Sequence, residues 1–175
     1  MSDRIKELRK IYGPPSERSS KKVINKLSDE IIDFINNSPF AVLASSDSNG
    51  NCDASPRGGL PGFVKVVDEK NLFIPDIKGN RLFQSFGNFA TNPKAALVFF
   101  IPGNNKMVRV NGRVSIIEKE AVMERIKQIE VSSLDENSEL IQGFILEVDE
   151  AYTHCPRALN FSDLWNIDNI KDNKK

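Results

Sequence analysis

The sequence predicts a mainly β protein, a six-stranded antiparallel β-barrel with helices at its periphery. Six short runs rich in Val, Ile and Phe are bounded by Gly, Asn, Asp or Pro, which is typical of strands. Turn signals join two pairs of these runs, as antiparallel hairpins require. Helical patterns lie at the start of the chain, after the third run, before the last run and at the end, where they can cover a barrel.

The first element along the chain is a helix. From Ser19 to Asn36, apolar residues recur at helical spacing with polar residues between them. This pattern predicts an amphipathic helix that is closed by Asn37 and Pro39. We therefore expect residues 1–37 to form an N-terminal helical segment packed on the barrel.

The strands follow this helix. We predict them at residues 40–45, 63–68, 72–75, 95–101, 107–117 and 143–152. The Asn-Gly step within residues 47–51 signals a tight turn between the first two strands, and residues 68–71 can turn the next pair back. Two further helices are expected over residues 81–89 and 119–131.

Length and charge restrict the classes of function. The chain has 175 residues, 39% of them hydrophobic, and can bury a core as one domain, which we assign to residues 38–167 before a polar tail at 168–175. Lys and Arg number 24, as do Asp and Glu, so the formal net charge is zero, which argues against nucleic-acid binding. Residues 38–114 nevertheless carry 9 basic and 5 acidic groups, whereas residues 115–175 carry 7 and 13. The basic centre suits a small anion such as a phosphate ester.

Cysteine content and apolar runs indicate where the protein works. Cys52 and Cys155 lie far apart and form no CxxC pair, which favours a reduced, cytoplasmic setting. The charged N-terminus lacks the about 7 to 15 apolar residues of a signal peptide, and no segment reaches the about 18 of a membrane span. One His and two Cys cannot fill a zinc shell without carboxylates at recognisable spacing, so we predict no metal site.

Two segments of the basic centre could bind an anion. A loop at Ser55–Gly59 would let the backbone approach a ligand, and Arg57 could direct two donors at a phosphate or a carbonyl-bearing ring; the alternative is a surface turn with a solvated arginine. In the segment 74–82, a strand ends and a helix begins with Asn80 as N-cap, so free N–H groups would lie beside Lys78 and Arg81. The alternative there is a capped helix with two solvated basic residues.

A third candidate lies within the strand 107–117. Its alternation places Met107, Arg109 and Asn111 on one face, and Val108 and Val110 on the other. Arg109 either faces solvent or is directed at an anionic ligand or across a subunit contact.

These segments, in this order and spacing over residues 38–117, resemble the pyridoxamine 5'-phosphate oxidase-like family of FMN-binding split barrels. The similarity is carried by Phe40–Ser45, Ser55–Gly58, Leu72–Pro75, Gly79–Arg81, Asn92–Pro93 and Val108–Gly112. The closing segments 151–159 and 164–165 resemble a bacterial subgroup whose members are mostly described only as FMN-dependent.

The resemblance implies a homodimer that binds two FMN molecules in clefts between its subunits. By its position relative to the family pattern, the Ser55–Gly58 loop is expected to contact the flavin ring or the phosphate. The resemblance also implies that the strand end at 74–76 lies against the ring and the ribityl chain, and that Asn80 and Arg81 bind the phosphate. Arg109 would reach the cofactor or the dimer seam, and the C-terminal segment would contribute to the flavin of the partner subunit. The implied cofactor-binding residues are Ser55, Arg57, Gly58, Ile74, Pro75, Asp76, Asn80, Arg81, Arg109, His154 and Arg157.

Departures from the family pattern bear on the reaction. Where true pyridoxamine phosphate oxidases carry a Tyr-Thr pair this chain has Ile74-Pro75, and their Arg-x-His element has no equivalent after Trp165. Vitamin B6 oxidation is therefore not expected. We expect an FMN-dependent oxidoreductase acting on a small molecule, with NAD(P)H or oxygen as partner; the flavin supplies the chemistry and no catalytic residue is assigned. The alternatives are a non-enzymatic flavin or haem binding, storage or sensing protein, and a deazaflavin-using relative.

Overall fold

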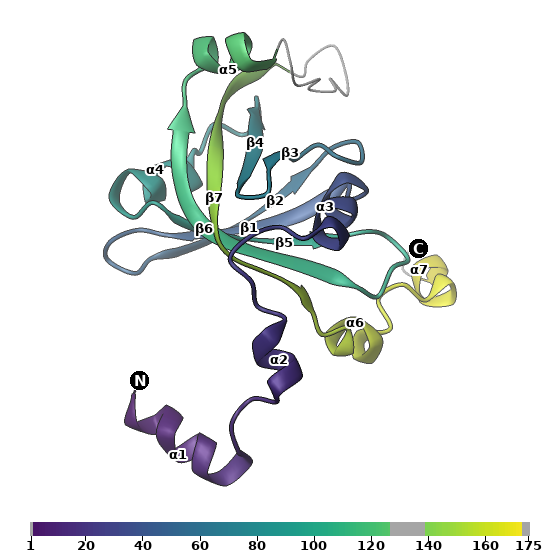
Figure 1. Cartoon of the computed structure of the whole chain (residues 1–175). Helices are drawn as coiled ribbons and strands as arrows, with labels where there is room; N and C mark the ends of the chain where they lie inside the picture. Colours follow the sequence, from purple (N-terminus) through teal and green to yellow (C-terminus); the bar gives the residue numbers. More distant parts are fainter. Residues whose placement is uncertain (1, 127–138, 173–175) are drawn as a thin grey trace.

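Seven strands form one continuous antiparallel sheet in the order β2-β1-β5-β6-β7-β4-β3. The structure is a computed structural model, which describes residues 2–126 and 139–172. In Figure 1, β6 and β7 bend, and so connect the layer of β1, β2 and β5 with that of β3 and β4. The mainly β antiparallel prediction is confirmed, with seven strands instead of six. The strands are β1 (Phe40–Ser46), β2 (Cys52–Gly58), β3 (Lys65–Asp68), β4 (Asn71–Ile77), β5 (Lys94–Phe100), β6 (Met107–Ile117) and β7 (Leu140–His154).

The additional strand is β2, which occupies residues that the sequence analysis assigned to a Pro-Gly loop. Ser55, Arg57 and Gly58 are therefore strand residues, and β2 pairs with β1 along its whole length. Pro56 makes this strand difficult to recognise in the sequence, because proline cannot donate a ladder hydrogen bond and is rare in strands. It is tolerated here because β2 is an edge strand of the sheet.

The predicted turns are present. Gly50 has φ 87°, its N–H donates to the Asp47 carbonyl oxygen at 3.2 Å, and the resulting hairpin joins β1 to β2. The turn at 68–71 joins β3 to β4, as predicted. The first turn was thus located correctly, but it leads into β2 rather than into the strand expected at 63–68.

The core lies inside the curved sheet. Val108 and Val110 are fully buried, while Arg109 and Asn111 are half-buried on the opposite face, which confirms the predicted alternation of β6. Phe86 and Phe89 of α4 (Gln84–Thr91) pack on Phe144 of β7 with ring centroids 6.0 and 5.2 Å apart. The largest fully buried side chains are Phe99, Phe144, Ile35, Leu43, Leu72, Ile74, Leu97, Leu146, Val64, Val108, Val110 and Val122.

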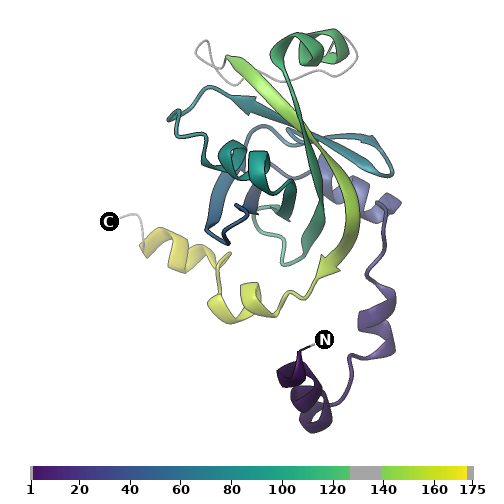
Figure 2. The same cartoon turned by 90° about the vertical axis from the view of Figure 1, so that its left-hand side faces the viewer.

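The N-terminal segment is three helices, not the single helix predicted over residues 19–36. They are α1 (Asp3–Tyr12), α2 (Glu17–Lys21) and α3 (Asp29–Asn36), of which α1 has no buried residue. Between α2 and α3 the chain is extended, because Ile24 exchanges two backbone hydrogen bonds with Ala151 of β7. Ser28 then caps α3, which packs on the sheet through Ile31, Phe34 and Ile35 and ends at Asn37, as predicted. Figures 1 and 2 show α1 and α2 extending away from the barrel.

The remaining helices are short. The helix expected over 119–131 is α5 (Lys119–Ile126), and residues 127–131 lie outside the described part of the chain. After β7 come α6 (Arg157–Ser162) and α7 (Ile167–Asp172), the latter in the region that we expected to be a polar tail. Within residues 2–126 and 139–172, no helix combines the length and the apolar character needed to cross a bilayer.

Candidate functional site

A polar cavity of about 240 Å³ lies between β2, the end of β4 and the start of α4. Residues from two separate stretches of sequence, 55–57 and 76–86, meet there, and five of the predicted cofactor-binding residues are among them. The lining consists of Ser55, Pro56, Arg57, Asp76, Ile77, Gly79, Asn80, Arg81, Leu82, Phe83, Gln84, Ser85 and Phe86.

Side chains along β2 alternate between the two faces of the sheet, and this alternation places two of them at the cavity. Ser55 and Arg57 point to the cavity side, and both are half-buried. Behind them, Asp53 Oδ2 accepts hydrogen bonds from Ser85 Oγ at 2.7 Å and from Ser55 Oγ at 3.0 Å. Because Ser85 is almost fully buried, this carboxylate fixes the first turn of α4 against β2.

Asp76 is the single carboxylate among the described residues that line the cavity. It lies opposite Gln142 in the β4–β7 ladder, and the Gln142 side chain hydrogen-bonds to it. Burial raises the pKa of Asp76, and this effect exceeds the opposing influences of the Arg57 charge and the Gln142 hydrogen bond. The carboxyl group is therefore held in a place that favours its neutral form more than water does.

The loop before α4 has an unusual backbone. Asn80 Oδ1 accepts the Leu82 N–H at 3.0 Å, so Asn80 closes a local turn. The prediction that Asn80 is the N-cap of the helix is therefore wrong. The N-cap position is held by Phe83, and both Phe83 (φ 50°) and Arg81 (φ 63°) adopt the left-handed conformation. Non-glycine residues rarely adopt it, at a cost on the order of 1 kcal/mol each. The loop brings Arg81 to the cavity beside the N–H groups of the first turn of α4.

Three other predicted residues belong to the same strands but are not among the lining residues. Ile74 is fully buried in the core, and Pro75 is buried next to it. Gly58 is exposed at the end of β2, opposite Phe40. Within one chain, these three predicted residues are therefore not part of the cavity lining.

The remaining predicted residues, Arg109, His154 and Arg157, lie away from the cavity, and the first two are on another face of the sheet. Arg109 lies opposite Tyr152, with its guanidinium carbon 5.9 Å from the ring centroid, and the ring of His154 stacks on Tyr152 at 6.0 Å. Lys22 Nζ lies 5.4 Å from the same ring centroid. Arg157, on α6, lies over the Phe161 ring instead. Within one chain these cations therefore do not line the cavity.

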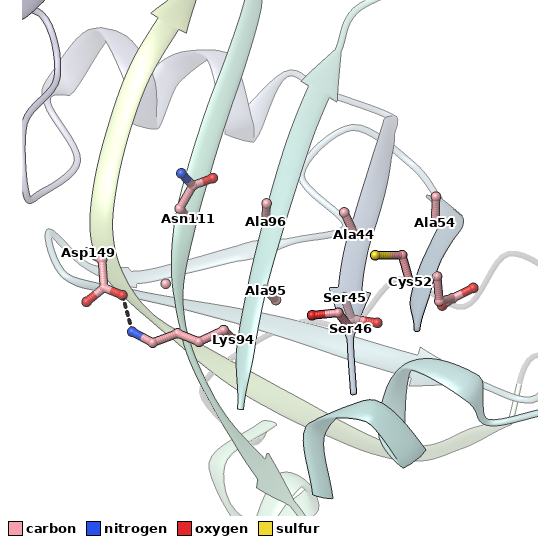
Figure 3. Close-up of a pocket in the computed structure, with 12 residues that line it drawn as sticks. Ala44, Ser45, Ser46, Cys52, Ala54, Lys94, Ala95, Ala96, Asn111 and Asp149 are labelled. Atoms are coloured by element: carbon pink, nitrogen blue, oxygen red, sulfur yellow. Dashed lines mark hydrogen bonds and ion pairs between the residues drawn. The ribbon is translucent and has the colours of Figure 1, made fainter. Parts of the chain in front are cut away.

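The same outer face carries a shallow hollow of about 520 Å³ (Figure 3). Small side chains form its floor, and the Lys94–Asp149 ion pair, with 2.5 Å between Nζ and Oδ2, stands at its rim. The apolar residues Ala44, Ala54 and Ala96 reach it from three adjacent strands, β1, β2 and β5. A broad, nearly flat surface of small residues is thus uncovered beside Arg109.

Comparison with known proteins now identifies the family. A family model described as Pyridoxamine 5'-phosphate oxidase matches residues 27–155, more than two thirds of the chain. The chain belongs to the pyridoxamine 5'-phosphate oxidase family. No curated protein matches its sequence significantly. The match includes β1 to β7 and therefore every strand that surrounds the cavity.

Solved structures with the split-barrel fold of this family superpose on the chain. A candidate pyridoxamine 5'-phosphate oxidase from Lactobacillus delbrueckii is 21% identical, with a TM-score of 0.56, and 74% of this chain and 95% of that chain are covered. An FMN-binding protein from Syntrophomonas wolfei is 11% identical, with a TM-score of 0.55 and coverages of 87% and 97%. HupZ from Group A Streptococcus is 17% identical, with a TM-score of 0.54 and coverages of 73% and 93%. At these identities the similarity establishes the fold.

Sequence reasoning missed several residues that build the cavity. Asp53 and Ser85 are 32 positions apart, and Gln142 reaches Asp76 from β7. The polar alternation Asp53, Ser55, Arg57 was the available signal, and it would have revealed β2 as a strand with one polar face. No local pattern indicates the contribution of Gln142, which depends on the β4–β7 pairing.

Proposed function

We propose that this protein binds FMN, with the phosphate group in the cavity between β2, β4 and α4, and acts as an oxidoreductase on a small molecule. The observation that carries the proposal is the meeting of Arg57 and Arg81 at the N-terminal turn of α4. Two guanidinium groups beside free N–H groups suit a phosphate monoester, because both offer charge-assisted hydrogen bonds. Membership of a flavin-binding family and the fold shared with an FMN-binding protein support FMN as the ligand.

The size of the cavity suits one end of such a ligand. About 240 Å³ is below the range of about 300 to 1,000 Å³ that is usual for pockets holding whole ligands. We therefore place the phosphate inside, between Arg57, Asp76 and Arg81 at the α4 turn, and the ring system outside the cavity, next to β2. FMN supplies the redox chemistry when bound, and the chain orients it and limits access of water.

The proposed working unit is a homodimer. The uncovered outer face presents Ala44, Ala54 and Ala96, which let another surface approach closely. Because β2 is an edge strand that contributes to both this face and the cavity, we propose that a second copy seated there extends past β2 and encloses the part of FMN that the cavity cannot hold. Arg109, on the same face, would then reach the dimer seam or the flavin of the second copy, together with two other predicted residues, His154 and Arg157.

The proposal includes a setting and a reaction partner. Cys52 and Cys155 are both free and exposed, which supports a reducing, cytoplasmic environment. We propose NAD(P)H or oxygen as the second substrate. Vitamin B6 oxidation is not proposed, because Ile74-Pro75 stands where true pyridoxamine phosphate oxidases have a Tyr-Thr pair.

Absorption spectroscopy and light scattering test the proposal. The purified protein should bind FMN at one molecule per chain, scatter light as a dimer and lose its yellow colour when NADPH or NADH is added without oxygen. Failure to bind any flavin would refute the proposal. A haem spectrum would favour the haem-binding alternative, and preference for a deazaflavin in a competition titration would refute FMN. Flavin that is bound but never reduced or reoxidised would favour the storage or sensing alternative.

A further inference from the structure

The cavity holds a carboxylate where an anion is expected to bind. Asp76 is half-buried at the end of β4 and lines the same cavity as Arg57 and Arg81. A phosphate monoester at neutral pH carries a charge of about −1.5 to −2. An ionised carboxylate in the same half-buried space would repel it, and this repulsion is stronger than in water because solvent screening is reduced.

The other charged and polar groups around Asp76 do not remove this conflict. Arg57 faces it from β2, Gln142 donates to it from β7, and Arg81 lies on the loop beside it. Lys78 is not a lining residue, and its Nζ is 3.5 Å from Glu139 Oε2. Asp53 lies behind the cavity, where it accepts two hydroxyl hydrogen bonds. With Asp76 ionised, the formal charges of the lining residues Arg57, Arg81 and Asp76 sum to +1. The negative charge of Asp53, behind the cavity, cancels this remaining positive charge.

We propose that Asp76 binds the phosphate group of the ligand as the neutral acid, so that one proton enters the site with each phosphate and the Asp76 O–H donates a hydrogen bond to a phosphoryl oxygen. The inference rests on the proposed function and adds the protonation state in which this residue recognises its ligand. Two physical changes drive the uptake. The phosphate competes with Asp76 for the Arg57 guanidinium, and it places a negative charge next to the carboxylate. Burial already raises the pKa of Asp76 before any ligand arrives.

The affinity for FMN should therefore depend on pH in a specific way. Where Asp76 is ionised in the free protein and neutral in the complex, the FMN dissociation constant should rise about tenfold per pH unit above pH 7. Riboflavin lacks the phosphate, so its dissociation constant should not change over the same range. Asp76→Asn supplies a permanent neutral donor, and its FMN affinity should be independent of pH and tighter than wild type at pH 8.

Calorimetry of the full-length protein at pH 7.5, in buffers with different ionisation enthalpies, counts the protons. The expected uptake is about one proton per FMN for wild type and for the control Asp33→Asn, an exposed carboxylate on α3, and about zero for Asp76→Asn. Wild-type FMN binding without proton uptake overturns the inference, and this measurement does not depend on the variant folding. Equal weakening of FMN and riboflavin by Asp76→Asn also overturns it, because Asp76 would then be an acceptor for the flavin ring. If wild type binds neither flavin, the proposed function itself has failed.

Discussion

Replacing Arg81 tests the phosphate site without disturbing the fold. Arg81 is exposed and has φ 63°, so glycine relieves backbone strain worth about 1 kcal/mol while adding a chain-entropy cost of about 0.5 to 1 kcal/mol. These effects nearly cancel, and the free energy of unfolding of Arg81→Gly should stay within about 0.5 kcal/mol of wild type. A hydrogen bond to a charged group contributes about 1.5 to 3 kcal/mol, so FMN binding should weaken by about 2 kcal/mol, roughly 30-fold.

Quenching of flavin fluorescence on titration measures this change. Arg81→Ala should weaken FMN binding as much as Arg81→Gly, and its free energy of unfolding should also stay close to wild type, because alanine and arginine carry the same backbone strain at this φ. Arg9→Ala removes the same charge from α1, which has no buried residue, and should leave the FMN affinity unchanged. Unchanged affinity in both Arg81 variants would remove this residue from the site. Equal weakening in Arg9→Ala would mean that the effect comes only from net charge.

Three further predictions concern stability and are checked by chemical unfolding. Gly112→Ala should destabilise the fold by about 2 to 4 kcal/mol, because the new methyl group would collide with a backbone carbonyl of β7 at the bulge. The control Gly87→Ala, in open space within α4, should stabilise the fold by about 0.5 to 1 kcal/mol. Equal changes in the free energy of unfolding for the two variants would contradict this reasoning. Ser85→Ala should cost about 1 to 3 kcal/mol, because it removes the 2.7 Å hydrogen bond to Asp53. Asp68→Ala should cost about 1 kcal/mol near neutral pH, since hydrogen bonds from Lys70 N–H and Asn71 lower the pKa of Asp68 in the folded state. That contribution is complete above the unfolded pKa of about 3.9 and is lost as the pH falls through the lower folded pKa, so a difference that persists in acid would contradict the assignment.

Local patterns in the sequence predicted most of the fold. The strands with clear Val, Ile and Phe enrichment were found because their residues face a buried core, and the Asn49-Gly50 step was found because a left-handed glycine is needed there. The prediction failed where a distant partner decides the conformation. Ile24 has the spacing of a helical residue, but it exchanges hydrogen bonds with Ala151, 127 positions later, and this pairing interrupts the predicted helix.

The candidate site was predictable to a similar degree. Ser55, Arg57, Asp76, Asn80 and Arg81 lie in two sequence clusters, and the structure brings them to one cavity. What could not be predicted is the protonation environment of Asp76, since it depends on burial and on groups from two other strands. The separation of the Arg109 cluster from this cavity also follows only from the sheet order.

The hairpin before β2 determines which side chains face the cavity. Strand residues alternate between faces, so Ser55 and Arg57 line the cavity while Cys52 and Ala54 line the outer hollow. A slip of one residue would exchange the two sets and place the guanidinium on the outer face. The register is held at the turn, where Asp47 Oδ1 accepts the backbone N–H groups of Asn49 and Asn51 at 2.9 Å. The Asn51 side-chain amide donates to Asp47 Oδ2 at 2.8 Å, and this bond together with the backbone bonds lowers the pKa of Asp47. An exposed turn at one end of the barrel thereby positions the arginine at the other end of the same strand.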